Sequence, residues 1–161
     1  MAGEDKAPSK KVEALPRRGL WLVSDRNRMI EVLHAVIVPV LRGRGFSGRF
    51  PDFRRITPAA VDLLSFHFAR HEPAFAVEAA CGPRTGANLA GHVFIPADEL
   101  TVWHVVPEGR YRLGPDEPDQ WFRFRRSLPF LGDPYQRAAK ALLPYLDSQA
   151  EVWWKQSSAA A

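Results

Sequence analysis

The segment from Val61 to Cys81 constrains the fold of this 161-residue chain more than any other. Its first half is apolar on both faces, as expected of a central strand, with Leu64, Phe66 and Phe68 on one side and Val61 and Leu63 on the other. After a turn at Glu72 and Pro73, an apolar alternation follows at Phe75, Val77, Ala79 and Cys81. The pattern predicts a hairpin at the centre of a sheet.

An apolar helix is predicted before this hairpin. Ser24 or Asp25 can cap it, and Pro39 predicts a kink or break near its end. Gly43 or Gly45 supplies a left-handed stop. Its apolar positions recur every three or four residues, at Ile30, Leu33, Ile37, Val40 and Leu41. Residues 46–57 then predict strand structure with a turn near Gly48 or Pro51.

The second half of the chain predicts shorter elements. Residues 82–91 are expected to form a glycine-containing loop, and residues 93–95 and 101–106 short strands. Residues 110–113 and 121–125 are two short runs that bracket a further loop. Asp133 followed by Pro134 is typical of a helix start, with Ala138, Ala141 and Leu142 facing inward. Pro144 is expected to end this helix, and Asp147 to cap a last one.

These elements predict one α+β domain over residues 20–156. It should consist of an N-terminal helix, an antiparallel or mixed sheet of about five strands, and C-terminal helices packed on one face. Residues 1–19 are expected to form a flexible basic tail, and residues 157–161 a disordered C-terminus. No segment has the apolar length of a membrane span or of a secretory signal, so a cytoplasmic protein is expected.

The formal net charge of +4 is unevenly distributed. Residues 1–28 contribute seven basic and four acidic side chains, whereas residues 56–161 contribute ten basic and twelve acidic ones. A local patch with five arginines and one aspartate spans Arg42 to Arg55. Since nucleic-acid proteins normally present a broad basic face, this distribution favours other functions.

We expect no metal site and no cofactor. His67 and His71 are four residues apart, but on a strand running into a turn this spacing places them about 13 Å apart. Cys81 ends an apolar alternation, as a buried structural cysteine does. The carboxylates at Asp98, Glu99 and residues 116–119 lie among Pro and Gly and are interpreted as solvated turns, not as an acid–base pair. An enzyme is therefore not the favoured interpretation.

The candidate binding residues are arginines next to aromatic rings. A guanidinium stacked on a ring can still present its donors to a carboxylate or phosphate. The alternative is that Phe122 and Phe124 face the core while the arginines only solvate the outer face. The candidate set is Arg110, Arg112, Trp121, Arg123 and Arg125, with Arg54 and Arg55 at its rim.

The order of several short motifs over residues 27–154 resembles the bacterial domain-of-unknown-function family 4304. This resemblance implies an α+β domain with an antiparallel sheet and gives no established activity. The chain has His67 where the family pattern has glutamine, and Phe122 in place of the second residue of a double tryptophan. The motifs are Val38-Pro39-Val40-Leu41, Arg44-Gly45-Phe46, Phe53-Arg54-Arg55, Leu63 to Phe68, Phe75-Ala76-Val77, Arg110-Tyr111-Arg112-Leu113-Gly114, Trp121-Phe122 and Leu143-Pro144-Tyr145-Leu146.

The leading functional hypothesis is a cytosolic binding or interaction module with a protein partner, for example an immunity-type protein that occupies its partner. One alternative is a nucleic-acid-associated protein that uses the basic tail and the patch from Arg42 to Arg55. Another is an enzyme that acts on an anionic small molecule through Arg110, Arg112 and Arg123, because spatial convergence is invisible in a sequence.

Overall fold

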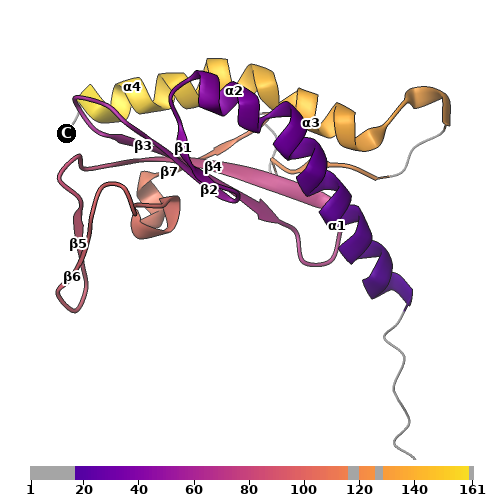
Figure 1. The fold of residues 1–161 in the computed structure, drawn as a ribbon, viewed down its shortest axis with the longest axis horizontal. Coiled ribbons are helices and arrows are strands. Elements are labelled where there is room, and N and C mark those ends of the chain that lie inside the picture. Colours follow the sequence, from indigo (N-terminus) through magenta and orange to yellow (C-terminus); the bar gives the residue numbers. More distant parts are fainter. Residues whose placement is uncertain (1–16, 116–119, 126–128, 160–161) are drawn as a thin grey trace, which may run out of the picture.

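The computed structural model describes residues 17–115, 120–125 and 129–159. Helices lie on one side of an antiparallel sheet, which confirms the α+β class (Figure 1). In chain order the elements are α1 (Arg17–Val36), α2 (Val38–Gly43), β1 (Ser47–Arg49), β2 (Asp52–Ile56), β3 (Val61–Phe68), β4 (Ala74–Gly82), β5 (Ala87–Leu89), β6 (Val93–Ile95), the 3-10 turns η1 (Val102–His104) and η2 (Pro107–Gly109), β7 (Arg110–Leu113), β8 (Phe122–Arg123), η3 (Pro129–Leu131), α3 (Pro134–Tyr145), the π-helical segment η4 (Leu146–Ala150) and α4 (Glu151–Ala159).

The main sheet has the strand order β1-β2-β3-β4-β7, and β8 also pairs with β4. β3 and β4 form the predicted central hairpin, in register from Val61 opposite Gly82 to Phe68 opposite Phe75. β7 and β8 pair with successive stretches of β4, since Leu113 lies opposite Val77 and Phe122 opposite Phe75. Two short segments of the chain thus complete one side of the sheet.

The N-terminal helix begins earlier than the sequence predicted. α1 starts at Arg17, so Ser24 and Asp25 do not cap it. Asp25 accepts a hydrogen bond of 2.7 Å from the Tyr135 hydroxyl and so links α1 to α3. The break before Pro39 is confirmed, because α1 ends at Val36 and α2 carries the proline in its first turn. The stop is also confirmed, with Gly45 in the left-handed region at φ 85°.

Two predictions between β4 and β7 are wrong. The expected loop at residues 82–91 contains β5, which pairs with β6 in a separate two-stranded sheet. Gly86 allows this pairing, because a Cβ there would lie 2.4 Å from the Ile95 carbonyl oxygen. Residues 101–106 are not a strand but contain η1, because the backbone N–H of Thr101 donates to His104 Nδ1 over 3.1 Å and closes a tight turn.

The C-terminal helices form one run rather than two separate helices. Asp133 caps α3 by accepting a hydrogen bond of 2.9 Å from the Tyr135 backbone N–H, as predicted. Pro144 does not end α3, and Asp147 is no cap, because the wider η4 turn continues the helix into α4. Gln149 in η4 donates to the Gly114 carbonyl over 2.7 Å and accepts from its N–H over 2.9 Å. The inward residues of α3 are Ala138, Ala139 and Leu142, whereas Ala141 is exposed.

Parts of the two expected terminal segments are helical. Residues 157–159, expected to be disordered, are the last residues of α4. Residues 17–19 of the expected tail belong to α1, and the rest of that tail lies outside the described residues.

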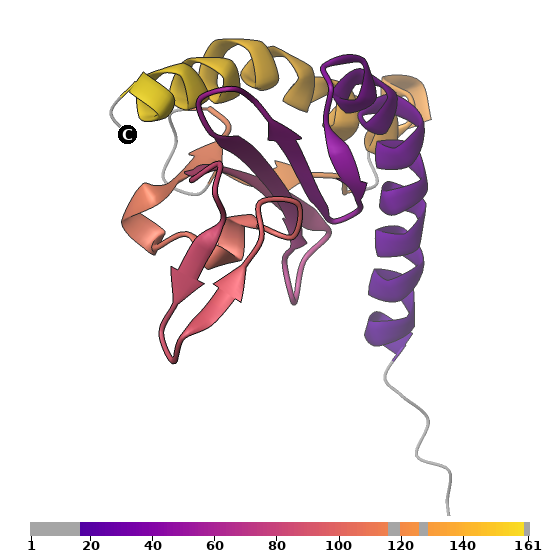
Figure 2. The same ribbon diagram turned by 60° about the vertical axis from the view of Figure 1, so that its left-hand side comes forward.

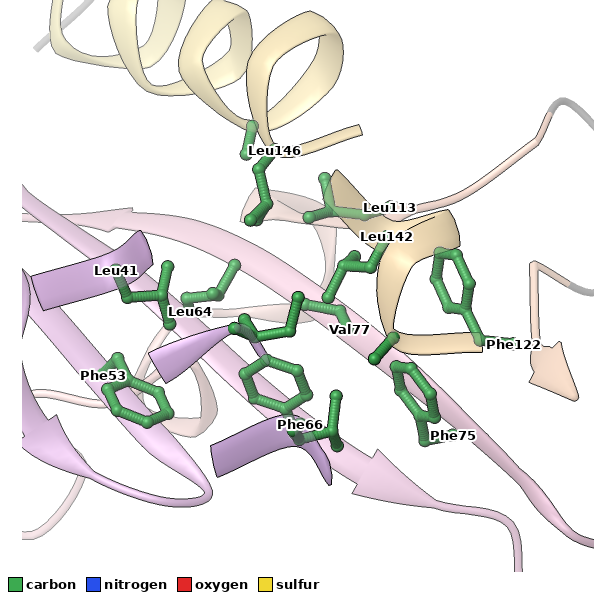
Figure 3. Packing of buried hydrophobic residues seen from close by; sticks show 14 of the residues in the cluster. Leu41, Phe53, Leu64, Phe66, Phe75, Val77, Leu113, Phe122, Leu142 and Leu146 are labelled. Atoms are coloured by element: carbon green, nitrogen blue, oxygen red, sulfur yellow. The ribbon is translucent and has the colours of Figure 1, made fainter. Parts of the chain in front are cut away.

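The main core lies between the helices and the sheet. Phe66, Phe75 and Leu142 belong to this layer, as Figure 3 shows. A smaller buried cluster lies on the opposite face and consists of Val61, Leu63, Ala80, Leu100 and Val102. Figure 2 shows the β5–β6 hairpin on that side of the sheet, away from the helices. The alternation predicted for β3 is therefore confirmed, with one apolar cluster on each face.

Candidate functional site

The side of the main sheet that faces away from the helices, here called the second face, carries a row of polar side chains. Strand register places Asp52 opposite Ser65, Ser65 opposite Glu78, and Glu78 opposite Arg112. Side chains directly opposite one another on neighbouring strands lie within contact range. The row therefore crosses β2, β3, β4 and β7 beside the smaller apolar cluster.

Hydrogen bonds join the members of this row. The Ser65 hydroxyl, which is fully buried, donates to the Asp52 carboxylate. Arg112 Nη2 donates to Glu78 Oε1 over 3.0 Å and to His67 Nε2 over 2.9 Å. Since Glu78 is only 14% exposed, its carboxylate depends on this guanidinium for charge compensation.

His67 connects the polar row to two tryptophans. Its ring centroid lies 5.8 Å from that of Trp103 and 5.4 Å from that of Trp121, both with edge-to-face geometry. Two guanidinium groups stack on the same rings, Arg110 on Trp103 and Arg112 on Trp121, each 5.1 Å from the ring centroid. We call these five residues the Arg–Trp cluster.

Burial lowers the pKa of His67, and the Arg112 charge adds to this effect, while Glu78 opposes it. The imidazole is therefore neutral near pH 7. Because its Nε2 accepts from Arg112, the proton resides on Nδ1. Within the described part of the chain, Nδ1 is buried and has no hydrogen-bond partner.

Arg110 is held by backbone groups. Its Nε donates to the Val105 carbonyl over 2.8 Å and its Nη2 to that of Trp103 over 3.3 Å. These bonds fix the guanidinium over the Trp103 ring, and Trp103 itself is 47% exposed. The tight η1 turn therefore presents a rigidly mounted aromatic ring to solvent.

The structure brings only part of the predicted site together. Arg110, Arg112 and Trp121 meet in the Arg–Trp cluster. Arg123 and Arg125 instead approach Glu72, at 3.4 and 3.6 Å. Phe122 and Phe124 are buried, so these two arginines fit the alternative in which they only solvate the outer face. Arg54 also lies on the second face, where it donates to the Asp98 carbonyl.

Arg55 lies on the helix-covered face, and the prediction that placed it at the rim of the site is corrected. It pairs with Asp62 at 2.9 Å and with Glu151 at 2.9 Å. Its guanidinium stacks over Phe46 and Trp154, at 4.8 and 5.2 Å from the ring centroids. These contacts stabilise the packing of β2 on α4.

Sequence reasoning missed two members of the cluster, His67 and Trp103. The alternation of β3 already put His67 on the face opposite Phe66, so that signal was present in the sequence. Trp103 had no such signal, because a strand was expected where η1 forms.

The remaining candidate residues have structural roles or no shared geometry. Burial, and to a lesser degree Asp62, raises the pKa of the Cys81 thiol, which fits a protonated structural side chain. Within residues 17–115, 120–125 and 129–159, no three His, Cys, Asp or Glu side chains cluster as metal ligands do. Among these residues, too, no helix has the length and apolar character needed to cross a membrane. The carboxylates at residues 116–119 lie outside the described residues.

No protein-family model, curated protein or solved structure matches this chain. The resemblance to family 4304 therefore stays a prediction.

Proposed function

We propose that this protein is a binding module that recognises a partner protein through the second face, with Trp103 at the centre of the contact. The observation that carries the proposal is the Arg–Trp cluster, in which two guanidinium–tryptophan stacks flank one half-buried imidazole. Tryptophan and arginine dominate the energetic centres of protein interfaces. Rigid aromatic rings also lose little conformational entropy on binding.

Apolar exposure on the same side supports a protein partner. Trp103 and Val106 are 47% and 65% exposed, and Phe94 in the β5–β6 hairpin is 54% exposed. Figures 1 and 2 agree that this hairpin and the 3-10 turns lie on the side away from the helices. Exposed apolar groups with a polar surround are typical of interaction sites.

The charge pairing on this face favours a protein partner over a phosphate-rich ligand. Arg112 is paired with Glu78, and Arg123 and Arg125 lie against Glu72. A nucleic acid or an anionic substrate would have to compete with these carboxylates for the same donors. A protein partner that packs on the aromatic rings of this face can bind without breaking these ion pairs.

Site-specific photo-crosslinking tests the proposal. Benzoylphenylalanine replaces Trp103 in one variant and Val152 in the other, since Val152 has a similar exposure of 45% but belongs to α4. In extract of the native cells, we expect one defined protein adduct from position 103 and none from position 152. Trp103→Ala should then weaken binding of the isolated partner by about 2 kcal/mol or more.

Equal adducts from both positions, or unchanged affinity of Trp103→Ala for the captured partner, would refute the proposed surface. Retention of the folded protein on DNA or RNA at about 0.15 M salt, with a steep salt dependence, would favour the nucleic-acid alternative.

A further inference from the structure

A hollow of about 260 Å³ lies between α1 and the turn that joins β3 to β4. Its walls are mainly apolar, and the accessible apolar surface comes from Val23, Phe68 and Pro73, since Phe124 is only 2% exposed. For scale, a buried cavity of about 150 Å³ is enough to hold a benzene molecule. The first turns of α1 extend past the end of the sheet here, as Figure 1 shows.

Two arginines line this hollow without a carboxylate partner among the described residues. Arg26 stacks over Phe68 at 5.3 Å from the ring centroid and donates to the Ala69 carbonyl over 3.3 Å. Arg70 is exposed in the turn after β3, and the described part of the chain offers its guanidinium no hydrogen bond or ion pair. Both groups retain donors that can serve a ligand.

The one acidic group of the lining does not cancel this positive charge. Glu72 already lies within 3.6 Å of both Arg123 and Arg125. The guanidinium groups of Arg26 and Arg70 therefore give the hollow an excess of positive charge next to aromatic walls. An anion with an apolar body complements both features.

We propose that this hollow binds a small aromatic monocarboxylate. The ring of the ligand packs against Phe68 and Pro73, and its carboxylate accepts hydrogen bonds from Arg26 and Arg70. The volume suits one ring with a short side arm. This site is separate from the Arg–Trp cluster, so the inference does not depend on the proposed function.

Titration of isotope-labelled full-length protein with 3-phenylpropanoate, followed by NMR, tests the site. We expect saturable shifts confined to signals of the residues that line the hollow, which include Val23, Arg26, Phe68 and Arg70. Arg70→Gln should weaken binding about tenfold, since it removes one charge-assisted contact. Arg70 makes no contact that folding depends on, so this variant is expected to fold. Arg49→Gln, which removes an exposed arginine outside the hollow, is the matched control and should bind normally.

Two further probes, one neutral and one larger, test which chemical features of the ligand the hollow recognises. 3-Phenylpropanol, which keeps the ring and lacks the charge, should bind at least about tenfold more weakly. Equal binding of the alcohol, the absence of saturable shifts up to about 10 mM acid, or unchanged affinity in Arg70→Gln overturns the proposal.

Acetyl-glycyl-phenylalanine with a free carboxylate distinguishes a peptide C-terminus from a free acid. Tighter binding of that peptide by about tenfold would overturn the small-molecule assignment.

Discussion

Arg55 and Glu151, which are 96 residues apart in the chain, form a two-pronged ion pair between β2 and α4. Arg55 Nη1 donates to Glu151 Oε1 over 3.1 Å, and Nη2 donates to Oε2 over 2.9 Å. Both side chains are less than a quarter exposed. Arg44 approaches the same carboxylate at 3.7 Å, so one glutamate holds two arginines of the basic patch at the helix layer.

Glu151→Gln should therefore destabilise the fold by about 1 to 3 kcal/mol, because it leaves a partly buried guanidinium without full charge compensation. Urea denaturation measures this change. Glu31→Gln is the control, since Glu31 belongs to a solvent-exposed pair with Arg28. That control should change stability by less than about 0.5 kcal/mol. Equal effects of the two substitutions would contradict a structural role for Glu151.

Phe66→Ala should cost about 3 to 5 kcal/mol, because it empties a site in the middle of the main core. Phe66 is 3% exposed and packs against Phe50, Phe53 and Phe75. Phe130, which is 79% exposed, provides the matched control. Thermal and denaturant unfolding of the two variants compares them directly. An unchanged thermal midpoint for Phe66→Ala would refute the assignment of the β3–β4 hairpin to the core.

Arg112→Ala should lower the free energy of unfolding by about 1 to 3 kcal/mol, because it leaves the largely buried Glu78 carboxylate without its ion-pair partner. The double variant Arg112→Ala with Glu78→Ala should recover part of this loss in a double-mutant cycle. Arg125→Ala is the control, since Arg125 is 67% exposed and lies 3.6 Å from Glu72. Strict additivity in the cycle would show that the two side chains do not depend on each other.

His67 should make the protein less stable as the pH falls below about 6.5. Its folded-state pKa is lowered from an ordinary value of 6.5, chiefly by burial, so the unfolded chain binds the proton more readily. Stability then rises with pH between the folded and unfolded pKa values and is fully regained above the latter. His67→Gln, which keeps an acceptor for Arg112, should flatten this dependence. Parallel pH profiles of the His67→Gln variant and the unaltered protein would contradict the assignment.

The sequence was most informative where one residue determines local geometry. Asp133 with Pro134 predicted the start of α3, and Gly43 or Gly45 predicted the stop after α2, which Gly45 supplies. The period-two alternation of Val61 to Cys81 predicted two central strands and correctly divided their side chains between the two faces. These signals depend on backbone preference and burial, which are readable from neighbouring residues alone.

The features that the sequence did not predict depend mainly on contacts between distant segments of the chain. The pairing of Glu78 with Arg112 follows from the register of β4 and β7, which are separated by a long connection. Pro144 was expected to end a helix, but η4 continues it, and the Ser148 hydroxyl donates to the Pro144 carbonyl. Arg55 belonged to the same Arg-Arg dipeptide as Arg54, yet neighbouring strand positions face opposite sides of a sheet. Only the fold could assign one arginine to each face.

The two hydrogen bonds between Gln149 and Gly114 have a consequence for how this protein behaves at high concentration. A carboxamide that both donates to and accepts from one backbone unit imitates the edge of an additional strand. Gly114 directly follows β7, which ends the main sheet on that side. Open strand edges recruit further strands and promote aggregation. The π-helical turn that carries Gln149 thus closes part of the sheet edge to self-association.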